Sequence, residues 1–227
     1  MSDSAFTSLN EYITAKEQDA TLIDARSDAS EYSLRTPSVA VGSLLGTLAA
    51  AGSAGSGAGV AGTGAASAGV TGAVAMTPAA GVVGLHILAG LPAKAALTCI
   101  DPEADHQARA KAAFRDAGFG SSRARFLPSR PLDVLGRLAA GAYHLVYADV
   151  DPVDLPAVVE AAWPLLSPGG TLVLAGSLLD ATITDPTRKD RGTLAAREAE
   201  ELVDGLEGAV VTRLPLDSGV TLVTRRG

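Results

Sequence analysis

Short apolar runs alternate with longer helical segments through most of the chain, and this alternation restricts the possible fold more than any other feature. Strand-like runs are expected at 73–76, 96–100, 124–127, 144–148, 171–175, 209–215 and 220–225. The last two are joined by Leu216-Asp217-Ser218-Gly219, which predicts a hairpin turn. Repeated βα units followed by a hairpin predict an α/β fold with a doubly wound, mostly parallel sheet and an antiparallel C-terminal strand.

The first part of the chain predicts helices instead. Residues 5–18 and 21–34 have helical periodicity, so 1–35 is interpreted as an N-terminal helical region ahead of the main domain, 36–227. Thr36-Pro37-Ser38 is expected to break the chain, because proline disfavours helical backbone at the preceding residue. A further helix is predicted at 41–50.

Residues 51–72 consist almost entirely of Ala, Gly, Ser and Thr. Such side chains bury little area, while ordering the backbone costs entropy, so a flexible loop is predicted. A Gly-rich loop can also cradle phosphate, but no Lys-Ser or Lys-Thr pair follows this one, so the phosphate-loop signature is missing.

Composition excludes several classes of function. The chain is 47% hydrophobic but only 4% aromatic, so a core built of Ala, Val and Leu is expected. The net charge of −7 argues against nucleic acid and anionic membranes as partners. No basic segment followed by an apolar run begins the chain, and no block of about 20 strongly apolar residues occurs. A cytoplasmic protein is expected. The lone cysteine, Cys99, is interpreted as a buried small hydrophobic residue.

In open α/β sheets, ligands bind at the carboxyl ends of the strands. The first strand ends at Thr77-Pro78-Ala79-Ala80-Gly81, where a Gly-rich nucleotide-binding loop is expected. Of the glycines expected in such a loop, the chain has only those from Gly81 onward. Asp101 follows Gly81 by about 20 residues, the spacing of a ribose-binding acid. The alternative for Asp101 is a helix cap. Pro102 follows it, and Arg130 could flank a bound base or simply be solvated.

Three acids, Asp149, Asp151 and Asp154, follow the fourth strand, and oxygen ligands of this kind suit Mg²⁺ or Ca²⁺. The next strand end offers only Ala175 and Gly176, which have no ligating side chain, so no metal is expected. Asp149 is placed at the ligand cleft, whereas Asp151 and Asp154 are interpreted as turn and cap residues.

The three histidines show no metal-binding spacing. His86 falls in an apolar helix and is predicted to be packed. His106 lies on a charged helix and is predicted to be solvated, and His144 begins a strand. The chain has no nucleophile elbow, so nothing supports hydrolase chemistry.

Several segments resemble a known family. Ser167-Pro168-Gly169-Gly170, after Leu165-Leu166, resembles the entry to the fifth strand of class I S-adenosylmethionine-dependent methyltransferases. Segment 143–151 is similar to the O-methyltransferases that include the caffeoyl-CoA enzymes. The family's ribose-binding strand, adenine-side loop and closing hairpin resemble residues 97–103, 129–135 and 214–223. The resemblance covers about 36 to 225 and implies a seven-stranded Rossmann-like sheet.

The resemblance also implies a function and shows where this chain departs from the family. It implies methyl transfer from S-adenosylmethionine to a hydroxyl of an unidentified small molecule, with no nucleic-acid or membrane partner, and a homodimer, which is usual in the family. Asp149 would be catalytic, and the cofactor would touch Thr77, Gly81, Asp101, Pro102, Arg130 and Asp149.

Ala75, Thr77 and Ala79 stand where the family has an acid and two glycines, and Ala175 and Gly176 replace a metal-binding Asp-Asn pair. Weak cofactor binding, mainly through Asp101, is therefore expected. The alternative is a catalytically inactive binding or scaffold protein that has kept the fold.

Overall fold

A single mixed sheet organises the described part of the chain. The computed structural model describes residues 3–17, 19–54 and 72–227. Seven strands occur there in the order β3-β2-β1-β4-β5-β7-β6. Their bounds are β1 Gly72–Met76, β2 Leu97–Ile100, β3 Ala124–Leu127, β4 Tyr143–Ala148, β5 Leu166–Ala175, β6 Ala209–Leu214 and β7 Val220–Arg225. The pairs from β3 to β5 are parallel, and β7 runs antiparallel to β5 and β6. The predicted doubly wound fold is confirmed.

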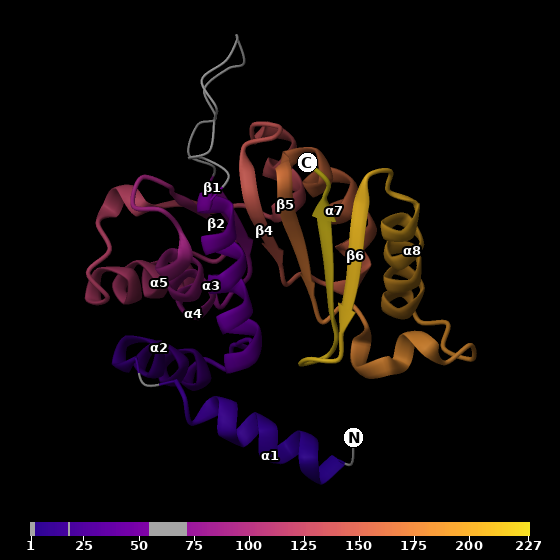
Figure 1. Ribbon diagram of the computed structural model, residues 1–227, viewed down its shortest axis with the longest axis horizontal. Helices are drawn as coiled ribbons and strands as arrows, with labels where there is room; N and C mark the ends of the chain where they lie inside the picture. The colour runs from indigo at the N-terminus through magenta and orange to yellow at the C-terminus, as the bar shows by residue number, and fades with distance from the viewer. Residues whose placement is uncertain (1–2, 18, 55–71) are drawn as a thin grey trace.

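Helices cover both faces of the sheet (Figure 1). One layer contains α3 Val39–Ala54, α4 Ala80–Gly90 and α5 Ala104–Asp116, and the other contains α6 Pro131–Val134, α7 Leu155–Ala162 and α8 Arg191–Gly205. Of the two N-terminal helices, α2 Ala20–Glu31 packs against α4 and α5, while α1 Asp3–Thr14 extends away from the sheet (Figure 1). Short 3₁₀ turns are η1 Ser121–Arg123, η2 Leu135–Arg137, η3 Pro152–Asp154, η4 Trp163–Leu165 and η5 Leu179–Thr184.

Side chains alternate between the two faces along each strand, and this produces two separate cores. In β1, Ala73 and Ala75 join the core beneath α3, α4 and α5. Val74 and Met76 join the core beneath α7 and α8. Because all four side chains are fully buried, β1 reads as a continuous apolar run, as is typical of a central parallel strand.

The layer of α3 and α4 is held together by glycines rather than by aromatic side chains. A Cβ added at Gly90 would lie 2.0 Å from the carbonyl oxygen of Gly46. A Cβ at Gly42 would lie 2.3 Å from the ring nitrogen Nε2 of His86. Close approach of two backbones replaces bulky side chains here, which explains how a chain with few aromatic residues fills this layer.

Element boundaries differ from prediction where caps or prolines decide them. The helix expected at 41–50 continues to Ala54 and β1 begins at Gly72, so these parts of segment 51–72 are regular structure; the remainder of the predicted flexible loop lies outside the described residues. Pro164 lacks an amide donor, and α7 changes to 3₁₀ geometry after Ala162. The last long helix begins at Arg191 because Asp190 caps it through the Thr193 amide.

No helix among the described residues is long and apolar enough to cross a bilayer. The proposed division at residue 35 stays a prediction.

Candidate functional site

The ends of β1 and β4 meet at a hydrogen bond between Thr77 and Asp149. The two strands are paired up to Met76 and Ala148, so the residues that follow them lie side by side. The Thr77 hydroxyl donates to Oδ2 of Asp149 at 3.1 Å and accepts the Ala79 amide at 3.2 Å. Thr77 therefore connects the first loop to the acid that follows β4, a role that a glycine at this position could not perform.

Asp149 lines a small cavity of about 40 Å³ at the ends of β4 and β5. The cavity also contains Ala175, Gly176, Arg35 and Asp217. Burial raises the pKa of Asp149, while the Thr77 hydrogen bond and the charge of Arg35 lower it; burial dominates. The space suffices for a few water-sized groups. Sequence analysis did not single out Arg35 or Asp217 for this cavity.

Asp101 follows β2 and is almost completely buried, with its side chain 5% exposed. Its Oδ1 accepts the Glu103 amide at 2.7 Å, and its Oδ2 lies 2.9 Å from Nδ1 of His106. The carbonyl of Asp101 accepts the side-chain amide of Gln107 at 2.8 Å. The carboxylate thus fixes the turn into α5. Each carboxylate oxygen still has a lone pair for a further donor, so the ribose role stays a prediction.

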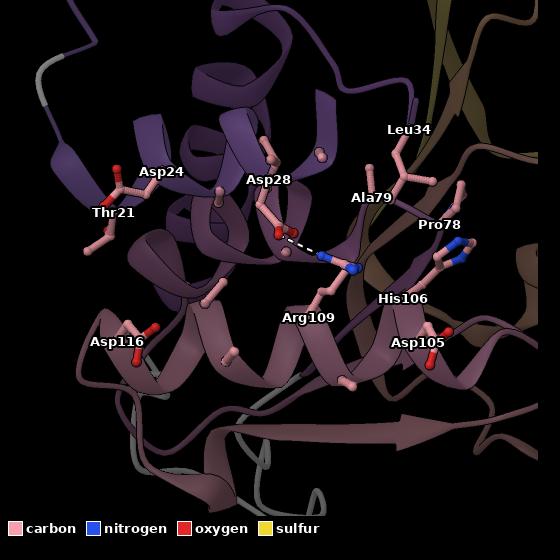
Figure 2. A pocket seen from close by; sticks show the side chains of 17 residues that line it. Thr21, Asp24, Asp28, Leu34, Pro78, Ala79, Asp105, His106, Arg109 and Asp116 are labelled. Atoms are coloured by element: carbon pink, nitrogen blue, oxygen red, sulfur yellow. Dashed lines mark hydrogen bonds and ion pairs between the residues drawn. The ribbon is translucent and has the colours of Figure 1, made fainter. Parts of the chain in front are cut away.

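The prediction for His106 is wrong. Its side chain is only 24% exposed, because the first turn of α5 places the ring against Asp101. His106 also lines a larger cavity of about 570 Å³ between α2 and α5. Figure 2 shows His106 with Leu34, Pro78 and Ala79 at one end of this cavity, close to the first loop, and an ion pair between Asp28 and Arg109 at 2.6 Å.

The other predicted cofactor contacts are separate from this cluster. Pro102 and Arg130 are exposed, and Arg130 precedes the first turn of α6. Gly81 lies in the first turn of α4, where an added Cβ would meet its nearest atom, Cα of Ala110, at 3.7 Å. This distance is ordinary contact, so protein packing alone does not demand glycine there. These three assignments stay predictions.

The remaining polar candidates have structural roles. Asp151 caps η3 through the Val153 amide at 3.0 Å, in agreement with its predicted role. His86 is packed as predicted and lies 3.2 Å from Arg26 and 3.4 Å from Glu17. Cys99 is buried, and burial raises the pKa of its thiol to about 12. Among the residues described, no three His, Cys, Asp or Glu side chains are grouped closely enough to hold a metal ion.

Comparisons with known proteins agree with this geometry. No protein-family model matches the chain. A curated protein of Mycobacterium avium (strain 104) is 39% identical over 146 residues, 64% of this chain and 66% of its own length, and its name assigns it to the O-methyltransferases. A second relative, from Mycobacterium marinum, carries the same name and is 40% identical over 146 residues, 64% of this chain and 65% of its own length. The chain belongs to the O-methyltransferase family. It spans about two thirds of the length of these O-methyltransferase relatives.

Solved structures share the fold of this chain. A Corynebacterium glutamicum protein is 53% identical with a TM-score of 0.89, covering 98% of each chain. The O-methyltransferase TomG from Streptomyces achromogenes, in complex with S-adenosylmethionine, has a TM-score of 0.82 at 21% identity, covering 100% of each chain. A Bacillus cereus O-methyltransferase in complex with S-adenosylhomocysteine has a TM-score of 0.80 at 17% identity, covering 96% of this chain and 97% of its own. At such low identities, the last two comparisons bear on the fold.

Proposed function

We propose that this protein transfers a methyl group from S-adenosylmethionine to an oxygen atom of a small molecule. The observation that carries the proposal is the meeting of Thr77 and Asp149 at the ends of adjacent parallel strands, with Asp101 following the next strand. In this fold class, ligands bind at that edge of the sheet. The names of the O-methyltransferase relatives support the same reaction.

The residues at this edge fit an adenosyl cofactor. Asp101 offers a buried carboxylate that is held rigidly by the Glu103 amide, with lone pairs left for ribose hydroxyls. The amides of Ala80 and Gly81, the first two residues of α4, have no acceptors within the helix and can contact a ligand. The cofactor would supply an electrophilic methyl group, and the protein has to bind, orient and deprotonate the acceptor.

A divalent metal ion does not fit the oxygen donors at the ends of β4 and β5. The cavity offers the carboxylates of Asp149 and Asp217 together with the cationic Arg35, while Ala175 and Gly176 have no oxygen-bearing side chains. Mg²⁺ and Ca²⁺ need six or more oxygen ligands. We therefore propose that Asp149 acts as a general base without a metal ion, because burial raises its pKa toward that of a useful proton acceptor.

The test is calorimetric titration of wild type and Asp101→Ala with S-adenosylhomocysteine. Wild type should bind, and the variant should bind roughly tenfold more weakly or worse, since hydrogen bonds to a carboxylate are worth about 1.5–3 kcal/mol each. Asp105→Ala, at the exposed acid immediately before His106, is the matched control. Equal affinity of wild type and Asp101→Ala would reject the ribose role.

A second candidate is a non-catalytic binding or scaffold protein. The observation that favours it is the state of Asp101, whose two carboxylate oxygens already have partners inside the protein. The altered loop positions Ala75 and Ala79 point the same way. Failure of both wild type and variant to bind either S-adenosylmethionine or S-adenosylhomocysteine would favour this candidate. The homodimer expected from the family resemblance remains a proposal.

A further inference from the structure

The connector between α2 and α3, residues 34–38, is fixed from both sides. The Arg26 guanidinium donates to the carbonyl of Pro37 and lies 3.4 Å from the hydroxyl of Thr36. On the other side, the Ser38 amide donates to Oδ2 of Asp217 at 3.1 Å. Arg26 belongs to α2 and Asp217 to the turn before β7, so the connector is clamped between two distant parts of the chain.

This clamp places Arg35 at the cavity that contains Asp149. Arg35 lines the cavity together with Ala175 and Gly176, and its positive charge acts on Asp149. Among the described residues, its guanidinium has no hydrogen bond or ion pair. Arg35 therefore keeps its donors available for a ligand.

The charged side chains in the cavity suit the removal of a proton from a hydroxyl group. Asp149 and Asp217 are the acidic groups and Arg35 is the cationic one, while Tyr147 has a pKa raised far above its usual value by burial and by both acids. One oxygen of Asp149 is occupied by Thr77, and within the described residues the other has no partner. A hydroxyl entering the cavity would meet a free carboxylate oxygen and a free guanidinium.

We infer that Arg35 is a catalytic residue that holds the acceptor oxygen as an anion beside Asp149. The inference rests on the proposed function. The O–H bond of the acceptor breaks, its proton passes to Asp149, and its electron pair stays on the oxygen beside Arg35. The planar guanidinium can offer two parallel donors to this oxygen and its neighbours.

The size of the cavity limits which part of an acceptor can enter it. A cavity of about 40 Å³ admits the reacting hydroxyl but not a ring, so the body of the acceptor lies outside it. A phenol loses its proton with a pKa of about 10, as tyrosine does, which is within reach of a carboxylate helped by a cation. A phenol is therefore a suitable probe of this cavity.

The experiment measures binding of 4-nitrophenol in the absence of any cofactor, at a pH where the free probe is half ionised. The absorption band of the phenolate reports the charged form directly. Wild type should enrich the bound phenolate, Arg35→Lys should retain part of the effect, and Arg35→Met should lose at least roughly tenfold in phenolate affinity. Arg137→Met, at an exposed arginine on η2 outside the cavities described above, should behave as wild type.

Two outcomes would overturn the inference. One is a wild-type protein that does not enrich the phenolate at millimolar probe. The other is an Arg35→Met protein, folded by circular dichroism, that binds the phenolate as well as wild type does. Because no cofactor is present, these outcomes are independent of the S-adenosylhomocysteine titration that tests the proposed function.

Discussion

Two aspartates follow parallel strands at the same edge of the sheet, yet their surroundings differ. Asp101 follows β2 and has both carboxylate oxygens bound by its own polypeptide, through the Glu103 amide and the ring of His106. Asp149 follows β4 and has one oxygen bound, by Thr77, while it faces a cavity and Arg35, which has no ion pair within the described part of the chain. A carboxylate with an internal partner on each oxygen stabilises the fold and keeps only its remaining lone pairs for a ligand, whereas one with an oxygen left without a partner is better placed to accept a proton. The same residue type at equivalent positions can therefore have different roles.

The largest expected effect concerns catalysis at the second aspartate. Asp149→Asn cannot accept a proton, so methyl transfer from labelled S-adenosylmethionine to simple phenols should fall roughly 100-fold or more. The exposed Asp154, which makes no capping bond, provides the control variant Asp154→Asn with unchanged rate. A fully active Asp149→Asn would remove the distinction between the two aspartates.

The next effect concerns stability at the first aspartate. Asp101→Ala removes two bonds to a buried carboxylate and should lower the free energy of unfolding by about 2–4 kcal/mol in urea denaturation. Asp151→Ala removes a single exposed amide contact and should cost about 1 kcal/mol or less. If both substitutions cost the same, Asp101 would not be the structural acid described here.

His106 allows the comparison to be sharpened. Its ring occupies one oxygen of Asp101 and so competes with a ribose hydroxyl. His106→Ala should therefore strengthen S-adenosylhomocysteine binding a few-fold, because this carboxylate oxygen then has no ring to share with a ribose hydroxyl. Calorimetry on His106→Ala and on the neighbouring Asp105→Ala would show whether the gain is specific. A loss of affinity would mean that His106 itself contacts the ligand.

The smallest expected effect is the pH dependence of stability at Asp149. Burial raises its pKa in the folded protein above the ordinary value of 3.8. Between pH 3.8 and the pKa of the folded protein, the folded state therefore binds more protons than the unfolded state. The wild type thus loses stability as pH rises through this window. Asp149→Asn should be more stable than wild type at neutral pH, and the difference should vanish below pH 3.8. Urea denaturation at several pH values measures this, and a constant difference would contradict it.

The sequence predicted the architecture well because its evidence is local. The strand at 124–127 is found as expected, and the turn at 216–219 closes with a bond of 2.8 Å from the Gly219 amide to the Leu216 carbonyl. Gly219 has a φ of +92°, which only glycine adopts easily. Such features depend on neighbouring residues and on the period of the apolar pattern.

The site was less predictable because it depends on contacts between distant residues. Thr77 and Asp149 are 72 positions apart and meet only through the register of β1 and β4. His106 looked solvated because its helix carries many charges, and only the direction in which α5 leaves Asp101 turns its ring inward. Arg35 gave no signal at all, since the path of the connector is set by Arg26 and Asp217.

The clamp on the connector has a consequence for synthesis of the chain. Ser38 and Asp217 are 179 residues apart, yet one hydrogen bond between them helps to place Arg35. During translation, the helices around Arg26 can form long before Asp217 leaves the ribosome. The nascent protein would then have its first helices in place while the cavity around Arg35 is still incomplete, so Arg35 would be fixed only after Asp217 has been made. An intermediate that lacks the turn containing Asp217 would therefore be chemically silent even where its helices are formed.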